Sequence, residues 1–314
     1  MADVVKKATR HGYNEGLVEL AKEHEDIICL DADLGHATGS LVFRKAFPDR
    51  YIETGIAEQD LIGMAAGLAR TGFVPFANSF AVFTAGRAFE IIRNAVCYSN
   101  VNVKIVGSHS GITPAGDGGT HQCIEDIAAM RSLPNMTVLS PCDFNQAKLM
   151  AKIMYEHYGP CYMRTSREPM PIITSLDDKI ELGKAQILKE GKDVCIVATG
   201  VMTCLAKQAV DELKEEGVDA ALVNIHTIKP LDMDTIKEYT RKCGGRVLVC
   251  EEANMYGGLG EAVSYGLVGT DGIKFDHVAV MDRFGQSGLS GELLEEYGIT
   301  AENIKAHALE LARR

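Results

Sequence analysis

The sequence lacks the long apolar runs and the positive charge that membrane and nucleic-acid partners require. It has no window of about 18 uninterrupted apolar residues. The segment Met1–Lys7 has no apolar core of the kind that a secretory signal needs. Against 32 Lys and Arg residues stand 43 Asp and Glu residues, for a net charge of −11. We therefore expect neither a general nucleic-acid binder nor a protein with a basic membrane-binding patch.

Paired cysteines are also missing. The nine cysteines form no Cys-x-x-Cys pair and no zinc-finger spacing. Most of them lie inside apolar segments, such as Cys195 in Val194–Ile196. This pattern predicts reduced, buried thiols that act as small apolar side chains, as is usual in a cytoplasmic protein.

Common catalytic and nucleotide-binding signatures are absent as well. There is no Gly-x-Ser-x-Gly elbow, no His-Glu-x-x-His helix and no pair of histidines four apart on a helix. Gly257–Gly260 opens a dinucleotide-like pattern, but Val263 occupies its last glycine position. We interpret this segment as a tight turn between a strand and a helix. We expect no catalytic metal held by this chain alone.

Strand-like and helix-like segments alternate from end to end. Short β-rich runs at residues 27–30, 74–76, 101–106, 137–139 and 161–163 are separated by amphipathic stretches of helical length, the first from about Val4 to Glu23. A second series follows, with strands at 194–198, 220–225 and 247–250 and helices at 203–216 and 232–243. This alternation predicts an α/β protein with two doubly wound domains, each a mostly parallel sheet with helices on both faces. Because Pro169, Pro171 and a polar stretch interrupt it, we place the domains at residues 1–180 and 181–314.

Candidate functional residues follow the strands of the first domain. Glu58 comes at the start of an apolar helix, after a strand at residues 51–53. Phe80 and Phe83 follow the strand predicted to end at Phe76, where sheets of this class bind ligands. Two aromatic side chains beside an acid are suited to enclosing a flat heteroaromatic ring.

A glycine-rich loop after the next strand carries several more polar groups. His109, Asp117 and His121 lie within 13 residues of one another in residues 107–122. Such a loop is costly to order unless it binds something.

Several of these motifs, taken in order, resemble the transketolase family. They are Leu30-Asp31-Ala32-Asp33, residues 47–53, Ile56-Ala57-Glu58-Gln59, Ser108-His109-Ser110-Gly111, residues 124–128, residues 130–134 and Arg164-Thr165-Ser166-Arg167, followed by residues 227–232 and 257–263. The first seven resemble the pyrimidine-binding domain of the family, and the last two resemble its C-terminal domain. The resemblance covers nearly the whole chain.

The resemblance implies a thiamine diphosphate site. It makes Glu58 the acid that hydrogen-bonds N1′ of the aminopyrimidine ring. That bond favours the imino tautomer, whose exocyclic 4′-nitrogen can remove the proton from the thiazolium C2. Phe80 and Phe83 resemble the family's ring-contacting aromatics, and Asp33 is taken as a further cofactor contact. His109 resembles the histidine that faces the reacting carbonyl, which gives Glu58 and His109 the catalytic roles.

The same resemblance implies a sugar phosphate substrate. His109 and Asp117 resemble residues that contact its hydroxyls, and His121 stands where the family has His or Gln near the phosphate end. Arg10 and Arg167 resemble the arginines that hold the phosphate, a role that suits planar guanidinium groups.

The match to the family has two departures. A serine that often contacts the phosphate is replaced by Ala37, with Thr38 beside it, and His36 is expected to be a solvent-exposed loop residue. The spacing from Phe83 to Arg87 is one residue longer than in many relatives.

The resemblance also implies a partner. Gly116-Asp117-Gly118 matches the opening of the family's diphosphate and magnesium motif, but no Asn-Asn follows to complete it. The diphosphate-binding domain therefore has no counterpart here, and we expect an N-terminal transketolase subunit to supply it together with Mg²⁺ or Ca²⁺. Thiamine diphosphate would then lie at the interface, in an α2β2 assembly, and this chain could also form a homodimer.

The predicted function is that of the C-terminal subunit of a split transketolase. It would transfer a two-carbon ketol group between sugar phosphates, and only with its partner. Two related enzymes stay open, a 2-oxo-acid dehydrogenase β subunit and, with less support, a deoxyxylulose-phosphate synthase fragment. The third alternative is a non-catalytic relic of the fold.

Overall fold

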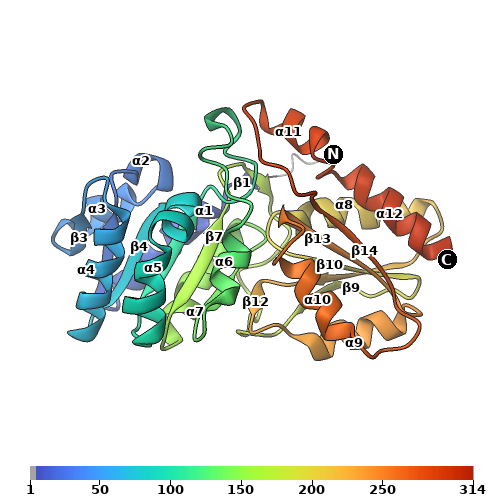
Figure 1. The fold of residues 1–314 in the computed structure, drawn as a ribbon, viewed down its shortest axis with the longest axis horizontal. Coiled ribbons are helices and arrows are strands. Elements are labelled where there is room, and N and C mark those ends of the chain that lie inside the picture. Colours follow the sequence, from blue (N-terminus) through green and yellow to red (C-terminus); the bar gives the residue numbers. More distant parts are fainter. Residues whose placement is uncertain (1–4, 314) are drawn as a thin grey trace.

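The computed structural model describes residues 5–313, which form two sheets flanked by helices (Figure 1). The seven-stranded sheet has the order β12-β6-β7-β5-β4-β2-β3, and the five-stranded sheet has the order β14-β13-β10-β11-β9. Neighbouring strands are parallel except at two edges, where β12 pairs antiparallel with β6 and β9 pairs antiparallel with β11. The predicted α/β class with two mostly parallel sheets is confirmed.

The strands belong to three sheets, the third being a small antiparallel pair. In chain order they are β1 (Lys6–Lys7), β2 (Ile27–Asp31), β3 (Tyr51–Glu53), β4 (Val74–Phe80), β5 (Lys104–Ser108), β6 (Thr137–Leu139), β7 (Cys161–Thr165), β8 (Met170–Pro171), β9 (Gln186–Lys189), β10 (Val194–Ala198), β11 (Ala220–Asn224), β12 (Thr227–Lys229), β13 (Arg246–Asn254) and β14 (Lys274–Val280).

The helices include two stretches of π-helix and two short 3₁₀ turns. They are α1 (Thr9–Ala21), α2 (Gly35–Thr38), α3 (Leu41–Ala46), η1 (Pro48–Arg50), α4 (Glu58–Arg70), η2 (Val82–Arg87), α5 (Phe89–Ile91), η3 (Ile92–Tyr98), η4 (Ala115–Asp117), α6 (Asp126–Ser132), α7 (Phe144–Glu156), α8 (Met202–Glu215), α9 (Met233–Lys242), α10 (Leu259–Leu267), α11 (Ser290–Glu296) and α12 (Ala301–Arg313). Within the described residues, no helix is both long and apolar enough to span a bilayer.

Apolar side chains on both faces of each sheet account for this layering. Strands β2, β5 and β7 are buried along their whole length, as parallel strands covered on both faces must be. One face of the seven-stranded sheet packs against α1 and α7, and the other against α4, η3 and α6. The five-stranded sheet is covered by α8 and α12 on one face and by α9 and α10 on the other.

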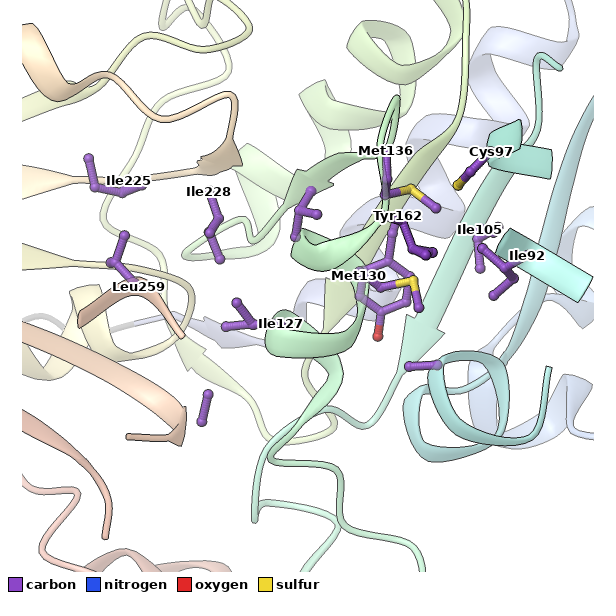
Figure 2. Packing of buried hydrophobic residues seen from close by; sticks show 14 of the residues in the cluster. Ile92, Cys97, Ile105, Ile127, Met130, Met136, Tyr162, Ile225, Ile228 and Leu259 are labelled. Atoms are coloured by element: carbon purple, nitrogen blue, oxygen red, sulfur yellow. The ribbon is translucent and has the colours of Figure 1, made fainter. Parts of the chain in front are cut away.

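The core that joins the two sheets is continuous. Figure 2 shows helix α6 between them, with Met130 directed toward Tyr162 of the seven-stranded sheet and Ile127 facing Leu259 of α10. Ile228 of β12 belongs to the same cluster. This shared apolar packing places the loops of the two sheets against each other at one end of the molecule (Figure 1).

Several predicted boundaries were wrong, among them the start of β5, which is Lys104 and not Val101, and the end of β13, which is Asn254 and not Cys250. Val4, where the first helix was predicted to begin, is not among the described residues, and the observed helix starts at Thr9. Lys6 and Lys7 are not helical because they pair with Pro171 and Met170. Strand β4 continues four residues beyond the predicted end at Phe76. The side chain of Asn78 can lie inside this buried strand because it accepts a hydrogen bond from the Tyr13 hydroxyl and donates to the Leu30 carbonyl.

The contact between α1 and α7 depends on glycine. A Cβ atom on Gly12 would lie 2.1 Å from the carbonyl oxygen of Phe144, and one on Gly16 would lie 2.4 Å from that of Lys148. We expect Gly12→Ala to lower the free energy of unfolding by about 1–3 kcal/mol, because a backbone atom has to move. Urea denaturation of the purified chain measures the change.

The matched control for this substitution is Gly67→Ala in α4. No atom lies within 4 Å of the added Cβ there, so the higher helix propensity of alanine is expected to stabilise the chain by up to about 1 kcal/mol. A Gly12→Ala chain as stable as the wild type would contradict the close approach of the two helices.

Candidate active site

The candidate site lies at the edge of the seven-stranded sheet where its parallel strands end. Phe80 is the last residue of β4 and pairs with Ser108, the last residue of β5. Both strands therefore deliver the residues that follow them to the same edge. The segment after β5, residues 109–122, is called here the histidine loop.

Four aromatic rings cluster at this edge. The rings of Phe80 and Phe83 are stacked, with centroids 5.9 Å apart and planes 11° from parallel. The His109 ring lies 4.4 Å from that of Phe80, and the edge of His121 meets Phe83 at 5.6 Å. The structure thus brings together four of the residues singled out from the sequence, from two segments nearly 30 positions apart.

His109 is held in a strained and buried setting. Its φ of 61° lies in the left-handed region that side chains other than glycine seldom adopt, and strain of this kind is concentrated at functional sites. The Nε2 atom lies 2.5 Å from Nη1 of Arg10 and 3.2 Å from the carbonyl oxygen of Ala37. The Nδ1 atom is buried and has no hydrogen-bond partner among the described residues.

The charge state of His109 follows from these surroundings. Burial, followed by the positive charges of Arg10 and Arg167, lowers the pKa of His109 to about 3. The ring is therefore neutral at physiological pH, and one of its nitrogens can accept a proton or a hydrogen bond.

The backbone near Ala37 is fixed by a buried aspartate. Asp31, at the end of β2, accepts hydrogen bonds at 2.8 Å from the hydroxyls of Thr38 and Ser40 and at 2.7 Å from the N–H of Leu34. Burial raises the pKa of Asp31 to about 6, in spite of these hydrogen bonds. Ala37 is the residue whose side chain departs from the family pattern. Its backbone carbonyl accepts a hydrogen bond from Nη1 of Arg10 at 2.9 Å.

The second arginine predicted at the substrate lies on the other side of the histidine loop. Arg167 donates from Nη1 to Oδ2 of Asp117 and to the carbonyl of Pro114, both at 2.9 Å. Both side chains of this ion pair are partly exposed. The positive charge of Arg167 reaches Arg10 and contributes, after burial, to lowering the pKa of Arg10. Arg10 contacts His109 and Arg167 contacts Asp117, so both guanidinium groups lie against the histidine loop.

Glu58 lies at the first turn of α4 with its side chain almost fully buried. Its nearest charged partner is Nε of Arg87, 3.8 Å from Oε2, and that arginine is largely exposed. Only 3% of Glu58 is exposed to solvent. Even so, no hydrogen-bond donor among the described residues reaches its carboxylate. A buried carboxylate with so little internal compensation is typical of a ligand-binding group.

The unusual spacing before Arg87 has a structural counterpart. Residues Val82–Arg87 form a π-helix, which accommodates one more residue per turn than an α-helix. This turn is what brings Arg87 to Glu58 while Phe83 stays stacked on Phe80.

Asp33 is not part of the aromatic cluster. It is exposed, has a φ of 60°, and its N–H donates a hydrogen bond to Glu53 at 2.8 Å.

A buried polar network behind the histidine loop was not predicted from the sequence. Asp126 of α6 accepts two hydrogen bonds from Arg164 at 3.1 Å and one from the Tyr162 hydroxyl at 2.8 Å. Arg164 also donates to the carbonyl of Glu252 in β13 at 3.1 Å, which links the two sheets. The sequence carries one signal of it, because an acidic pair at residues 251–252 at the end of an apolar strand has to find partners on burial.

The glycine-rich turn at residues 257–260 has no free anion site. The carboxylate of Glu251 accepts hydrogen bonds from the N–H groups of Leu259 and Gly260, both at 2.7 Å. This carboxylate takes the position at the helix N-terminus that a phosphate would need. Within residues 5–313, no cluster of three or more His, Cys, Asp and Glu side chains is arranged to hold a metal ion.

Comparisons with known proteins agree with this geometry. Residues 5–171 match the family model "Transketolase, pyrimidine binding domain", and residues 183–304 match "Transketolase, C-terminal domain". The 6-deoxy-6-sulfo-D-fructose transketolase subunit SqwH of Clostridium sp. (strain MSTE9) is 40% identical over 97% of this chain and 94% of its own length. Human transketolase is 38% identical over 95% of this chain, which spans 48% of the human protein. A solved "Split gene transketolase, inactive beta4 tetramer" is 44% identical, covers 98% of both chains and has a TM-score of 0.88.

The fold and the two family models define an α/β protein with the two domains of the transketolase type, and the chain belongs to the transketolase family. Within that family it is the C-terminal section of a split transketolase, the part that carries the pyrimidine-binding and C-terminal domains.

The protonation of His109 is directly testable. We expect its ring to stay neutral from pH 8 down to about pH 4, because burial and two arginines lower its pKa to about 3. The unfolded chain binds this proton at an ordinary pKa of about 6.5, so stability contributed by His109 falls as the pH decreases from 6.5 toward 3. Carbon NMR of histidine-labelled protein measures the titration, with His109→Gln to assign the signal. A midpoint near 6.5 would contradict the described surroundings.

Proposed function

We propose that this chain, together with an N-terminal subunit, is a transketolase that moves a two-carbon ketol group between sugar phosphates. The observation that carries the proposal is the buried carboxylate of Glu58, which has no hydrogen-bond donor among the described residues. Its charged neighbour Arg87 lies in the same π-helix as Phe83, whose ring stacks on Phe80. The family to which the chain belongs supports the same assignment.

These residues fit the aminopyrimidine end of thiamine diphosphate. Glu58 would accept or share a proton with a ring nitrogen, and the flat faces of Phe80 and Phe83 would contact the ring. Asp33 is kept as a proposed contact at the rim of the site. When bound, thiamine diphosphate supplies the carbanion chemistry that cleaves and forms the carbon–carbon bond.

The rest of the site is suited to a phosphorylated sugar. Neutral His109 would face the reacting carbonyl and hold or accept a proton there, while Asp117 and His121 would contact hydroxyls. Arg10 and Arg167 would bind the phosphate with planar, charge-assisted hydrogen bonds. Because Arg167 is paired with Asp117 in this structure, substrate would have to share or displace that ion pair.

The metal and the diphosphate belong to the partner in this proposal. The chain corresponds to about half of a full-length relative, and the N-terminal subunit would supply the missing domain with Mg²⁺ or Ca²⁺. An α2β2 assembly follows, and the solved split transketolase titled as an inactive β4 tetramer supports inactivity and self-association without the partner. We propose the cytoplasm as its location, since all nine cysteines are unpaired and buried.

The division into two domains at residue 180 is part of the same proposal. The segment between β8 and β9 has no strand or helix of its own, and it connects the two sheets. The two arginines that contact the histidine loop favour a sugar phosphate over the 2-oxo acid of the alternative dehydrogenase reading.

The experiment is reconstitution of this chain with the N-terminal subunit encoded beside it. With thiamine diphosphate and magnesium present, ketol transfer from xylulose 5-phosphate to ribose 5-phosphate is measured for the wild type, for each subunit alone and for Glu58→Ala. We expect activity only from the pair, and a loss of about 10²–10⁴-fold in Glu58→Ala because proton transfer at the ring is lost. Gly67→Ala, distant from the site, is the matched control.

The other outcomes distinguish the alternatives. Turnover of pyruvate without ketol transfer would replace the proposal by the dehydrogenase reading. A complex that forms but neither binds thiamine diphosphate nor turns over any donor would support a non-catalytic relic. Because SqwH is named for a sulfonated sugar, 6-deoxy-6-sulfo-D-fructose is included as a donor.

A further inference from the structure

The carboxylate of Glu252 contacts the histidine loop from the opposite sheet. Glu252 lies in β13 of the five-stranded sheet and is 4% exposed. Its Oε1 atom accepts hydrogen bonds from the N–H groups of Ile112 and Thr113, at 2.8 and 3.1 Å. These two residues follow His109 by three and four positions. One carboxylate thus satisfies two buried backbone donors beside the site, each of which would otherwise be costly.

The loop is shaped to receive this carboxylate. Gly111 has a φ of 76°, and a Cβ atom there would lie 2.2 Å from the carboxyl carbon of Glu252. The backbone can approach the carboxylate only because this position is glycine. Arg164, paired with Asp126, donates to the Glu252 carbonyl and holds the strand end from the other side.

A second contact from the same sheet region holds the far end of the loop. Gln122 donates from Nε2 to the carbonyl of Ile112 at 2.9 Å and to that of Gln286 at 3.0 Å. A Cβ on Gly118 would lie 2.6 Å from the Ser287 hydroxyl. The segment after β14 therefore covers the part of the loop that carries Asp117.

We propose that Glu252 is a positioning residue for ketol transfer: it fixes the histidine loop at Ile112 and Thr113 and so sets His109 and Asp117 at the substrate. The inference rests on the proposed function. It gives the C-terminal part of the chain a direct role at the site, because the geometry of the histidine loop depends on a side chain from the five-stranded sheet. Displacement of a reacting group by about 1 Å can cost about 10²-fold in rate.

The variant that tests this is Glu252→Ala, and Glu252→Gln is the rescue. Burial, partly offset by Arg164 and the two N–H groups, raises the pKa of Glu252 to about 7, so the neutral amide is a close substitute that keeps an accepting oxygen. Glu251→Ala is the matched control. Glu251 lies on the same strand as Glu252, and its buried carboxylate also accepts hydrogen bonds from two backbone N–H groups. Those N–H groups belong to α10 and not to the histidine loop.

Two measurements are made on the complex with the N-terminal subunit. Hydrogen exchange of the amides of Ile112 and Thr113 is expected to be about 10–100-fold faster in Glu252→Ala, because their acceptor is gone. In the transfer assay, kcat/KM is expected to fall by about 10–100-fold, with a rise in donor KM. Glu252→Gln restores both, and Glu251→Ala lowers the thermal midpoint without changing either.

The outcomes separate this inference from the proposed function. Unchanged exchange at Ile112 and Thr113 in Glu252→Ala overturns it, as does an equal loss of kcat/KM in Glu251→Ala. If exchange is faster in Glu252→Ala but the wild-type complex transfers no ketol group, the contact of Glu252 with the histidine loop is supported and the proposed function is rejected. If Glu252→Ala does not fold, Gly111→Ala is used instead. Its Cβ would lie 2.2 Å from the carboxyl carbon of Glu252, so it forces the loop and the carboxylate apart without removing either, and it must show the same two changes.

Discussion

The buried ion pair of Asp126 and Arg164 is the interaction on which the arrangement of the site depends. Both side chains are almost completely removed from water, and Arg164 also donates a hydrogen bond to the carbonyl of Glu252. Removing one partner of such a pair costs about 3–5 kcal/mol because the other charge is left uncompensated. The pair therefore fixes helix α6, strand β7 and strand β13 relative to one another, at the point where the two sheets meet.

From that fixed point the chemistry of the site follows by short steps. Glu252 links the network to the histidine loop, and the loop holds His109 in a left-handed conformation. Burial, followed by the charge of Arg10, lowers the pKa of the His109 ring and keeps it neutral. On the other side of the sheet edge, a π-helical turn sets Arg87 beside Glu58. The strained backbone of His109 and the nearly uncompensated carboxylate of Glu58 both lie where buried packing holds the fold in place.

The fold class could be predicted from the sequence because parallel strands buried on both faces are continuous apolar runs, as in Ile27–Leu30 and Val194–Ala198. Residues with a distinctive chemistry in a loop, such as His109 and Asp117, were also recognisable. The end of β4 was not, because Asn78 and Ser79 look like loop residues, and the long-range partners of Asn78, Tyr13 and Leu30, cannot be read from the sequence. Nor could the role of Glu252 be predicted, since its partners lie about 140 positions away and are backbone groups. The π-helix was visible only as a one-residue change in spacing.

In the proposed function, the chain supplies one half of a cofactor site, the pyrimidine and sugar ends, and the diphosphate and metal are left to another subunit. Calorimetric titration of thiamine diphosphate with magnesium tests this most directly, first into this chain alone and then into its complex with the N-terminal subunit. The account predicts binding at least about 100-fold weaker to the chain alone, a difference of about 2.7 kcal/mol. Equal affinity for the chain alone would contradict it, because the whole site would then lie within these 314 residues.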